Sequence, residues 1–133
     1  MAGPATDLLA RVELFSELKP RELRQIAGSM KEHTYRAGRH VVTEGEAGIG
    51  FFVIESGTAS VSVVGGEVRT LGPGDYFGEI ALVADTPRTA TVTAETELSC
   101  WALTTWAFRP IVKSNPSIAW KLLQKMGRLL AGK

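Results

Sequence analysis

The 133-residue chain has little of several residue types, and each shortage excludes a class of function. Its one cysteine, Cys100, cannot form an internal disulfide, which together with the lack of a signal peptide favours a reducing compartment, the cytoplasm. Two histidines, His33 and His40, make a poor metal site, and no metal or cofactor is expected. No apolar run approaches the roughly 18 residues that a membrane span needs. Fifteen basic and fourteen acidic side chains give a net charge of +1, so no global field attracts nucleic acid.

The chain does have enough apolar residues for one core. Its length and its apolar content of 44% predict a single domain over residues 1–133. Within residues 1–31 we expect two short helices. The first covers Asp7–Phe15, with a polar cap at its start, and the second follows Pro20, because proline suits the first turn of a helix.

The middle and the end of the chain have different periods. Residues 32–103 contain short runs of Val, Ile, Phe and Thr separated by glycines, which is typical of a small antiparallel β-structure. Residues 104–133 return to a helical period, in two helices that Asn115 and Pro116 separate as cap and first position. The order predicts an α+β fold: helices, a β-roll, then two C-terminal helices.

The most informative segment is Phe77-Gly78-Glu79-Ile80-Ala81-Leu82, followed after a short spacer by Pro87-Arg88-Thr89-Ala90-Thr91-Val92. Gly78 allows close approach of the backbone, and the run that begins at Glu79 is long enough for one or two helical turns, whose free amides bind anions. Arg88 offers a planar, permanently charged fork that suits a phosphate. Glu79, as an ionised acid, accepts a hydrogen bond from a sugar hydroxyl. One acid for a diol and one arginine for a phosphate describe a nucleotide.

These two motifs, in this order and with this spacer, resemble the phosphate-binding cassette of cyclic nucleotide-binding domains. Such domains occur in cAMP- and cGMP-dependent kinases, catabolite-activator-type regulators and cyclic-nucleotide-gated channels. The resemblance covers nearly the whole chain and implies an eight-stranded antiparallel jelly-roll barrel with a short cassette helix, the cassette lying at residues 77–92. It implies that Arg88 holds the exocyclic phosphate oxygens and that Glu79 holds the ribose 2′-hydroxyl. The other ligand-binding residues that it implies are Gly78, Ile80, Ala81, Thr89 and Ala90, with backbone amides from Gly78, Ala81 and Ala90.

Two positions leave the ligand and the response open. A hydroxyl at Thr89 is associated in the family with the guanine amino group or with the phosphate, but plain β-propensity explains a threonine there almost as well. Both cAMP and cGMP therefore stay possible ligands. The chain departs from the family at Ile49, where an acidic residue usually supports the arginine, and this departure puts the relay in doubt more than the pocket.

Further candidates lie outside the cassette. Val61 and Val63 are candidates for the base pocket, although core packing explains them about as well. Arg128 and Leu129 are candidates for a lid on the base, with packing on the barrel or on another subunit as the alternative.

The leading hypothesis is a regulatory sensor, not an enzyme, that binds cAMP or cGMP and relays occupancy by moving the hinge and lid helices of residues 104–133. The alternative is a nucleotide-unresponsive interaction or dimerisation module of the same fold, whose partner is a second copy or an effector at the C-terminal helix. A cupin-type enzyme is disfavoured by the shortage of histidines. No direct nucleic-acid contact is expected.

Overall fold

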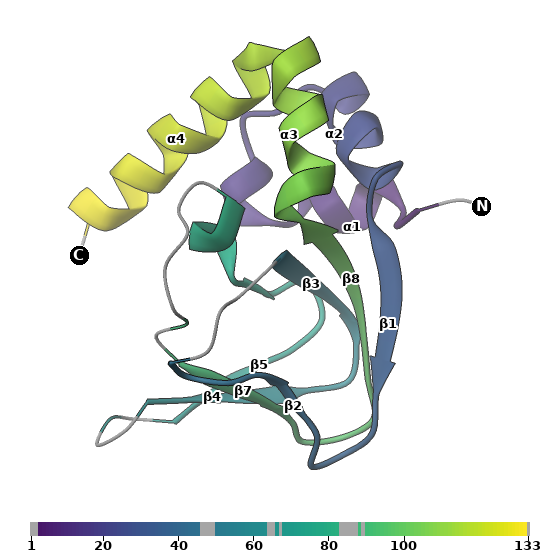
Figure 1. The fold of residues 1–133 in the computed structure, drawn as a ribbon, viewed down its shortest axis with the longest axis vertical. Coiled ribbons are helices and arrows are strands. Elements are labelled where there is room, and N and C mark those ends of the chain that lie inside the picture. Colours follow the sequence, from purple (N-terminus) through teal and green to yellow (C-terminus); the bar gives the residue numbers. More distant parts are fainter. Residues whose placement is uncertain are drawn as a thin grey trace.

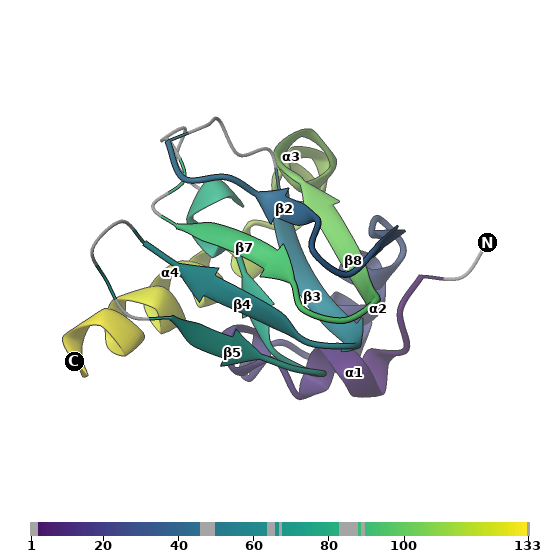
Figure 2. The same cartoon turned by 90° about the horizontal axis from the view of Figure 1, so that it is seen from below.

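The computed structural model describes residues 3–45, 50–63, 66, 68–82, 88 and 90–132, and it shows two four-stranded sheets with helices at one end (Figure 1). The first sheet has the order β1 (Lys31–Tyr35), β8 (Leu98–Thr104), β3 (Gly50–Ser56) and β6 (Tyr76–Phe77). The second has the order β2 (His40–Val42), β7 (Thr91–Ala94), β4 (Ala59–Ser62) and β5 (Arg69–Leu71). All of these strand pairs are antiparallel, which confirms the expected α+β fold with an eight-stranded roll. Figure 2 shows the second sheet face-on, with the first behind it.

Six helical elements accompany the strands within the described residues. They are α1 (Thr6–Ala10), η1 (Glu13–Phe15), α2 (Pro20–Ala27), η2 (Glu79–Leu82), α3 (Thr105–Ser114) and α4 (Pro116–Ala131), of which η1 and η2 are 3₁₀ turns. The expected helix starts at Pro20 and Pro116 are confirmed. The helix α3 follows β8 directly, and Thr104 caps it because its Oγ1 accepts a hydrogen bond from the Ala107 N–H at 3.1 Å.

The expected continuous helix over Asp7–Phe15 is wrong. An extended residue, Val12, separates α1 from η1, and the cap of α1, Ala5, makes no side-chain hydrogen bond. Leu14 and Phe15 are neighbours in sequence, and both are 1% exposed. Leu9 of α1 and both of these residues of η1 belong to the same core, so the break does not separate the two turns in space.

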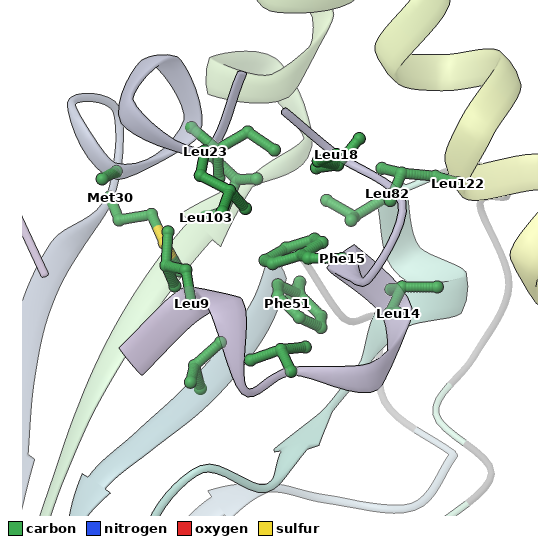
Figure 3. Packing of buried hydrophobic residues seen from close by; sticks show 14 of the residues in the cluster. Leu9, Leu14, Phe15, Leu18, Leu23, Met30, Phe51, Leu82, Leu103 and Leu122 are labelled. Carbon is green, nitrogen blue, oxygen red and sulfur yellow. The ribbon is translucent and has the colours of Figure 1, made fainter. Parts of the chain in front are cut away.

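The central strands of the first sheet, β8 and β3, are buried on both faces and separate two cores, whereas the edge strand β1 is largely exposed. Along β8, Cys100 and Ala102 pack into the roll, while Trp101 and Leu103 pack against the helices. The expectation that Cys100 is a small core residue is confirmed, since it is fully buried. Figure 3 shows the helical core, in which residues of η1, β3 and η2 meet α4.

Both histidines lie where the sequence predicts them, at sheet edges. His33 belongs to β1 and His40 to β2, each the first strand in the order of its sheet, and both residues are exposed.

Candidate functional site

Within the cassette, Gly78 follows β6 immediately. Its φ of +84° is in the region that glycine adopts at low cost. A Cβ on Gly78 would lie 2.5 Å from Arg88 Nη1 and 2.6 Å from the Gly50 carbonyl oxygen, so the position also has no room for a side chain. The Ala81 N–H donates to the Gly78 carbonyl at 3.1 Å and closes the turn of η2. The backbone conformation and the nearby Gly50 carbonyl therefore both require glycine here.

Arg88 is half-buried beside this turn and is held by backbone. Its Nη2 donates to the Gly50 carbonyl at 2.5 Å. Its Nε is buried and has no hydrogen-bond partner among the described residues. Burial lowers the pKa of Arg88 from its ordinary value, and the Glu79 carboxylate counteracts this by raising it. The guanidinium stays charged and keeps a donor free for an anionic oxygen.

The backbone around Arg88 is also fixed. The Gly45 N–H donates to the Arg88 carbonyl at 2.8 Å, and the Glu44 N–H donates to Thr91 Oγ1 at 3.0 Å. These bonds join the segment before β7 to the segment after β2. Hydrogen bonds of its main chain, as well as the bond of its guanidinium group, therefore hold Arg88 in position.

The structure brings the main cassette residues together. A Cβ on Gly78 would meet the Arg88 guanidinium, and Glu79 is near enough to affect the pKa of Arg88. Glu79 also raises the pKa of Tyr76, after the larger effect of burial. Ala90 is half-buried just before β7. The ligand contacts assigned to these residues stay predictions.

The other predicted residues lie in different places. Val61 packs against the core of the roll, whereas Val63 is 40% exposed and lies beyond the end of β4. Arg128 pairs with Glu17, and Leu129 is half-buried. Thr89, Ile49 and the side chain of Ile80 lie outside the described residues.

Sequence reasoning missed two members of the site, Gly50 and Thr105. Gly50 contributes a carbonyl oxygen to Arg88, and a Cβ on it would lie 3.1 Å from the Leu103 carbonyl. Thr105, the first residue of α3, donates its hydroxyl to the Ala81 carbonyl at 2.8 Å. Every residue has a carbonyl, so no pattern in the sequence marks Gly50 as an acceptor. A threonine near the start of the helix could be seen in the sequence, but the carbonyl that accepts its hydrogen bond could not be predicted.

The described residues contain no group of three or more His, Cys, Asp or Glu side chains that could hold a metal ion. Within the same ranges, every helix is too short or too polar for a membrane crossing.

Known proteins resemble this chain in sequence. A family model described as the cyclic nucleotide-binding domain matches residues 32–115. The chain is 47% identical over 92 residues to a cAMP-dependent protein kinase regulatory subunit of Yarrowia lipolytica, and the match covers 68% of this chain and 24% of the relative. The chain therefore spans about a quarter of the length of this curated relative.

Solved structures resemble it over nearly its whole length. The N-terminal domain of a transcriptional regulator from Streptomyces coelicolor A3(2) has a TM-score of 0.83 and 31% identity, with coverage of 95% of this chain and 94% of that one. The cAMP-bound PfPKA-R (141-441) has a TM-score of 0.72 and 29% identity, with coverage of 93% and 45%. From the family match and these relatives, the chain belongs to the cyclic nucleotide-binding domain family.

Proposed function

We propose that this chain is a regulatory domain that binds cAMP or cGMP in the β-roll against η2, without chemical turnover, and relays occupancy through α3 and α4. One observation carries the proposal: Arg88 is half-buried, fixed by the Gly50 carbonyl at 2.5 Å, and keeps a buried Nε without a partner among the described residues. A buried cationic donor is costly unless an acceptor reaches it. A phosphate oxygen supplies both the acceptor and the opposite charge.

Glu79 supports a nucleotide over a simple phosphate. Its carboxylate lies close enough to Arg88 to affect the pKa of the guanidinium, yet it would repel an anion placed between them. A ribose hydroxyl donates to a carboxylate without that repulsion. The pair therefore suits a ligand with a phosphate at one end and a hydroxyl at the other. The cAMP-bound state of the similar PfPKA-R structure supports the same ligand class.

Two contacts join η2 to the C-terminal helices. Thr105 Oγ1 donates to the Ala81 carbonyl at 2.8 Å. Leu82 packs in the helical core with Leu122 of α4, as Figure 3 shows. A ligand that draws η2 towards Arg88 would change both contacts. The size of the response is limited by the difference in ligand affinity between the two helix positions.

Calorimetric titration with cAMP and with cGMP tests the proposal. We expect Arg88→Ala to weaken binding by roughly 10- to 100-fold, since a hydrogen bond to a charged group contributes about 1.5–3 kcal/mol. Arg69→Ala, which removes an exposed arginine of β5, is the matched control and should bind as the unmodified chain does. Equal affinity in the Arg88→Ala variant would defeat the assigned role.

A second candidate function, the dimerisation module, is favoured by one observation on α4. Trp120 and Leu123 are three residues apart on this helix and are 60% and 53% exposed. Large apolar side chains on one exposed side of a helix are typical of an association surface. A chain that binds neither nucleotide, runs as a dimer by light scattering, and becomes a monomer in the Trp120→Ser, Leu123→Ser double variant would favour this function.

A further inference from the structure

The net charge is only +1, but basic and acidic residues are unevenly distributed along the chain. Residues 98–133 contain six basic and no acidic residues, whereas residues 32–97 contain ten acidic and four basic residues. Among the described residues, the basic part includes β8, α3 and α4, and the acidic part includes β2, β3, β4, β5, β6 and β7. At physiological ionic strength, charges are screened beyond about 8 Å. A partner that touches the helices therefore meets a cationic surface and not the average charge.

The exposed charges of α2, α3 and α4 are all positive. Together these helices carry seven basic residues and one acid, Glu22, which is 3% exposed and pairs with Lys121. Four exposed cations of α2 and α3 make no ion pair within the described residues: Arg21, Arg24, Arg109 and Lys113. They carry charge that neighbouring side chains do not neutralise.

The outward side of α3 adds an aromatic residue to these cations. Trp106, Arg109 and Lys113 follow one another at intervals of three and four residues, which places them in one stripe. Phe108 and Ile111 are buried and fix the opposite side of the helix against the core. Trp106 is 62% exposed, so the stripe combines an uncovered indole with two positive charges.

The helix α2 continues this surface. It lies beside α3 in Figure 1, and Gln25 Nε2 donates to Ser114 Oγ across the two helices at 3.2 Å. Arg21 lies one turn before Gln25, and Lys113 directly precedes Ser114. Arg21 of α2 and Lys113 of α3 therefore lie near the contact between the two helices.

We propose that this cationic face, defined as Arg21, Arg24, Trp106, Arg109 and Lys113, docks an acidic segment of another protein that places one apolar side chain against Trp106. Tryptophan and arginine are the residue types that most often dominate binding energy at interfaces, and opposite charges steer the encounter. A bilayer surface favours a continuous apolar stripe, and a nucleic-acid duplex keeps its base faces stacked inside and presents a charged backbone to the indole. One aromatic residue among four cations matches an acidic segment with a single apolar anchor.

The position of the face gives such a partner access to the nucleotide site. The helix α3 begins at Thr105, whose hydroxyl donates to the Ala81 carbonyl of η2. A segment docked on α3 therefore sits on the helix that contacts the cassette. Only this coupling rests on the proposed function; the docking itself depends on the charges and on Trp106.

The probe is a fluorescent peptide of glutamates around one central phenylalanine, and its control has glutamine in place of every glutamate. Fluorescence anisotropy should show binding of the acidic peptide to the intact chain, and binding of the glutamine peptide weaker by about tenfold or more. The Arg109→Glu, Lys113→Glu double variant and, separately, Trp106→Ala should each weaken binding of the acidic peptide by about tenfold. A charge reversal elsewhere, Arg69→Glu on β5, should leave the affinity within about twofold.

Absence of peptide binding at 0.1 M salt, or an equal loss in Arg69→Glu, would overturn the proposal. Tighter binding of phosphatidylserine vesicles or duplex DNA, lost in the same two variants, would assign the face to lipid or to nucleic acid instead. The Arg88→Ala variant separates this proposal from the nucleotide site. Retained peptide binding in that variant supports a docking face that stands without the ligand, whereas its loss would contradict the assignment of the contacts to α2 and α3.

Discussion

Glu22 joins the N-terminal helices to α4 through both oxygens of its carboxylate. Oε1 accepts from Lys121 Nζ at 2.7 Å and from the Lys19 N–H at 2.8 Å, and Oε2 accepts from Ser117 Oγ at 2.8 Å. The residue is 3% exposed. Burial raises the pKa of Glu22, but the hydrogen bonds from Lys121, Lys19 and Ser117 together outweigh this effect and lower the pKa from 4.5 to about 2.

This pKa predicts the effect of Glu22→Gln, which keeps the shape of the side chain and removes its charge. A pKa about 2.5 below the ordinary value corresponds to about 3 kcal/mol of stability at neutral pH. Because the folded-state pKa is below the unfolded-state value, this stability is complete above about pH 5 and is lost as the pH falls towards 2. We expect the free energy of unfolding to be lower in the variant by about 3 kcal/mol at pH 7 and by about 1 kcal/mol at pH 3.

Urea unfolding followed by tryptophan fluorescence at both pH values measures the difference. The control is Glu17→Gln, because Glu17 pairs with Arg128 where the two side chains are 39% and 53% exposed. An exposed pair contributes about 1 kcal/mol at most, so the control should change stability little at either pH. Equal losses in the two variants, or a loss in Glu22→Gln that is the same at pH 3 and pH 7, would contradict a stabilising charge on Glu22.

Three further predictions concern the cassette and the core. Gly78→Ala should lower stability by about 1–2 kcal/mol, because its φ is positive and its Cβ would lie 2.6 Å from the Gly50 carbonyl oxygen. It should also abolish nucleotide binding, because the same Cβ would lie 2.5 Å from Arg88 Nη1 and displace the guanidinium. A thermal melt and a titration check this, with Gly72→Ala, which has open space, as the control. Thr105→Val removes the hydroxyl that donates to η2. We expect it to leave the affinity for nucleotide within a few-fold but to reduce the ligand-induced change in tryptophan fluorescence. An undiminished fluorescence change would rule out this contact as part of the relay. Burial raises the pKa of the Cys100 thiol to about 12. At pH 8 the folded chain should therefore react slowly with a thiol reagent, and the urea-unfolded chain should react rapidly. Rapid reaction of the folded chain would contradict the buried position of Cys100.

Features that depend on neighbouring residues could be predicted from the amino-acid sequence alone. Alternating apolar and polar residues between glycines predicted the β-roll, because successive side chains of a strand point to opposite faces. Pro20 and Pro116 marked the starts of two helices, because proline fixes φ and needs no donor there. The cassette motif was continuous enough to identify Gly78 and Arg88 and to associate them with a nucleotide phosphate.

Contacts between residues far apart in the sequence became visible only in the folded chain. Arg88 is held by the Gly50 carbonyl 38 residues away, and Glu22 binds Lys121 99 residues away. Val12 interrupts a segment that has a helical period, and Val12, Leu14 and Phe15 are all buried in one core. Patterns of neighbouring residues report backbone preferences, whereas such contacts depend on how the whole core packs.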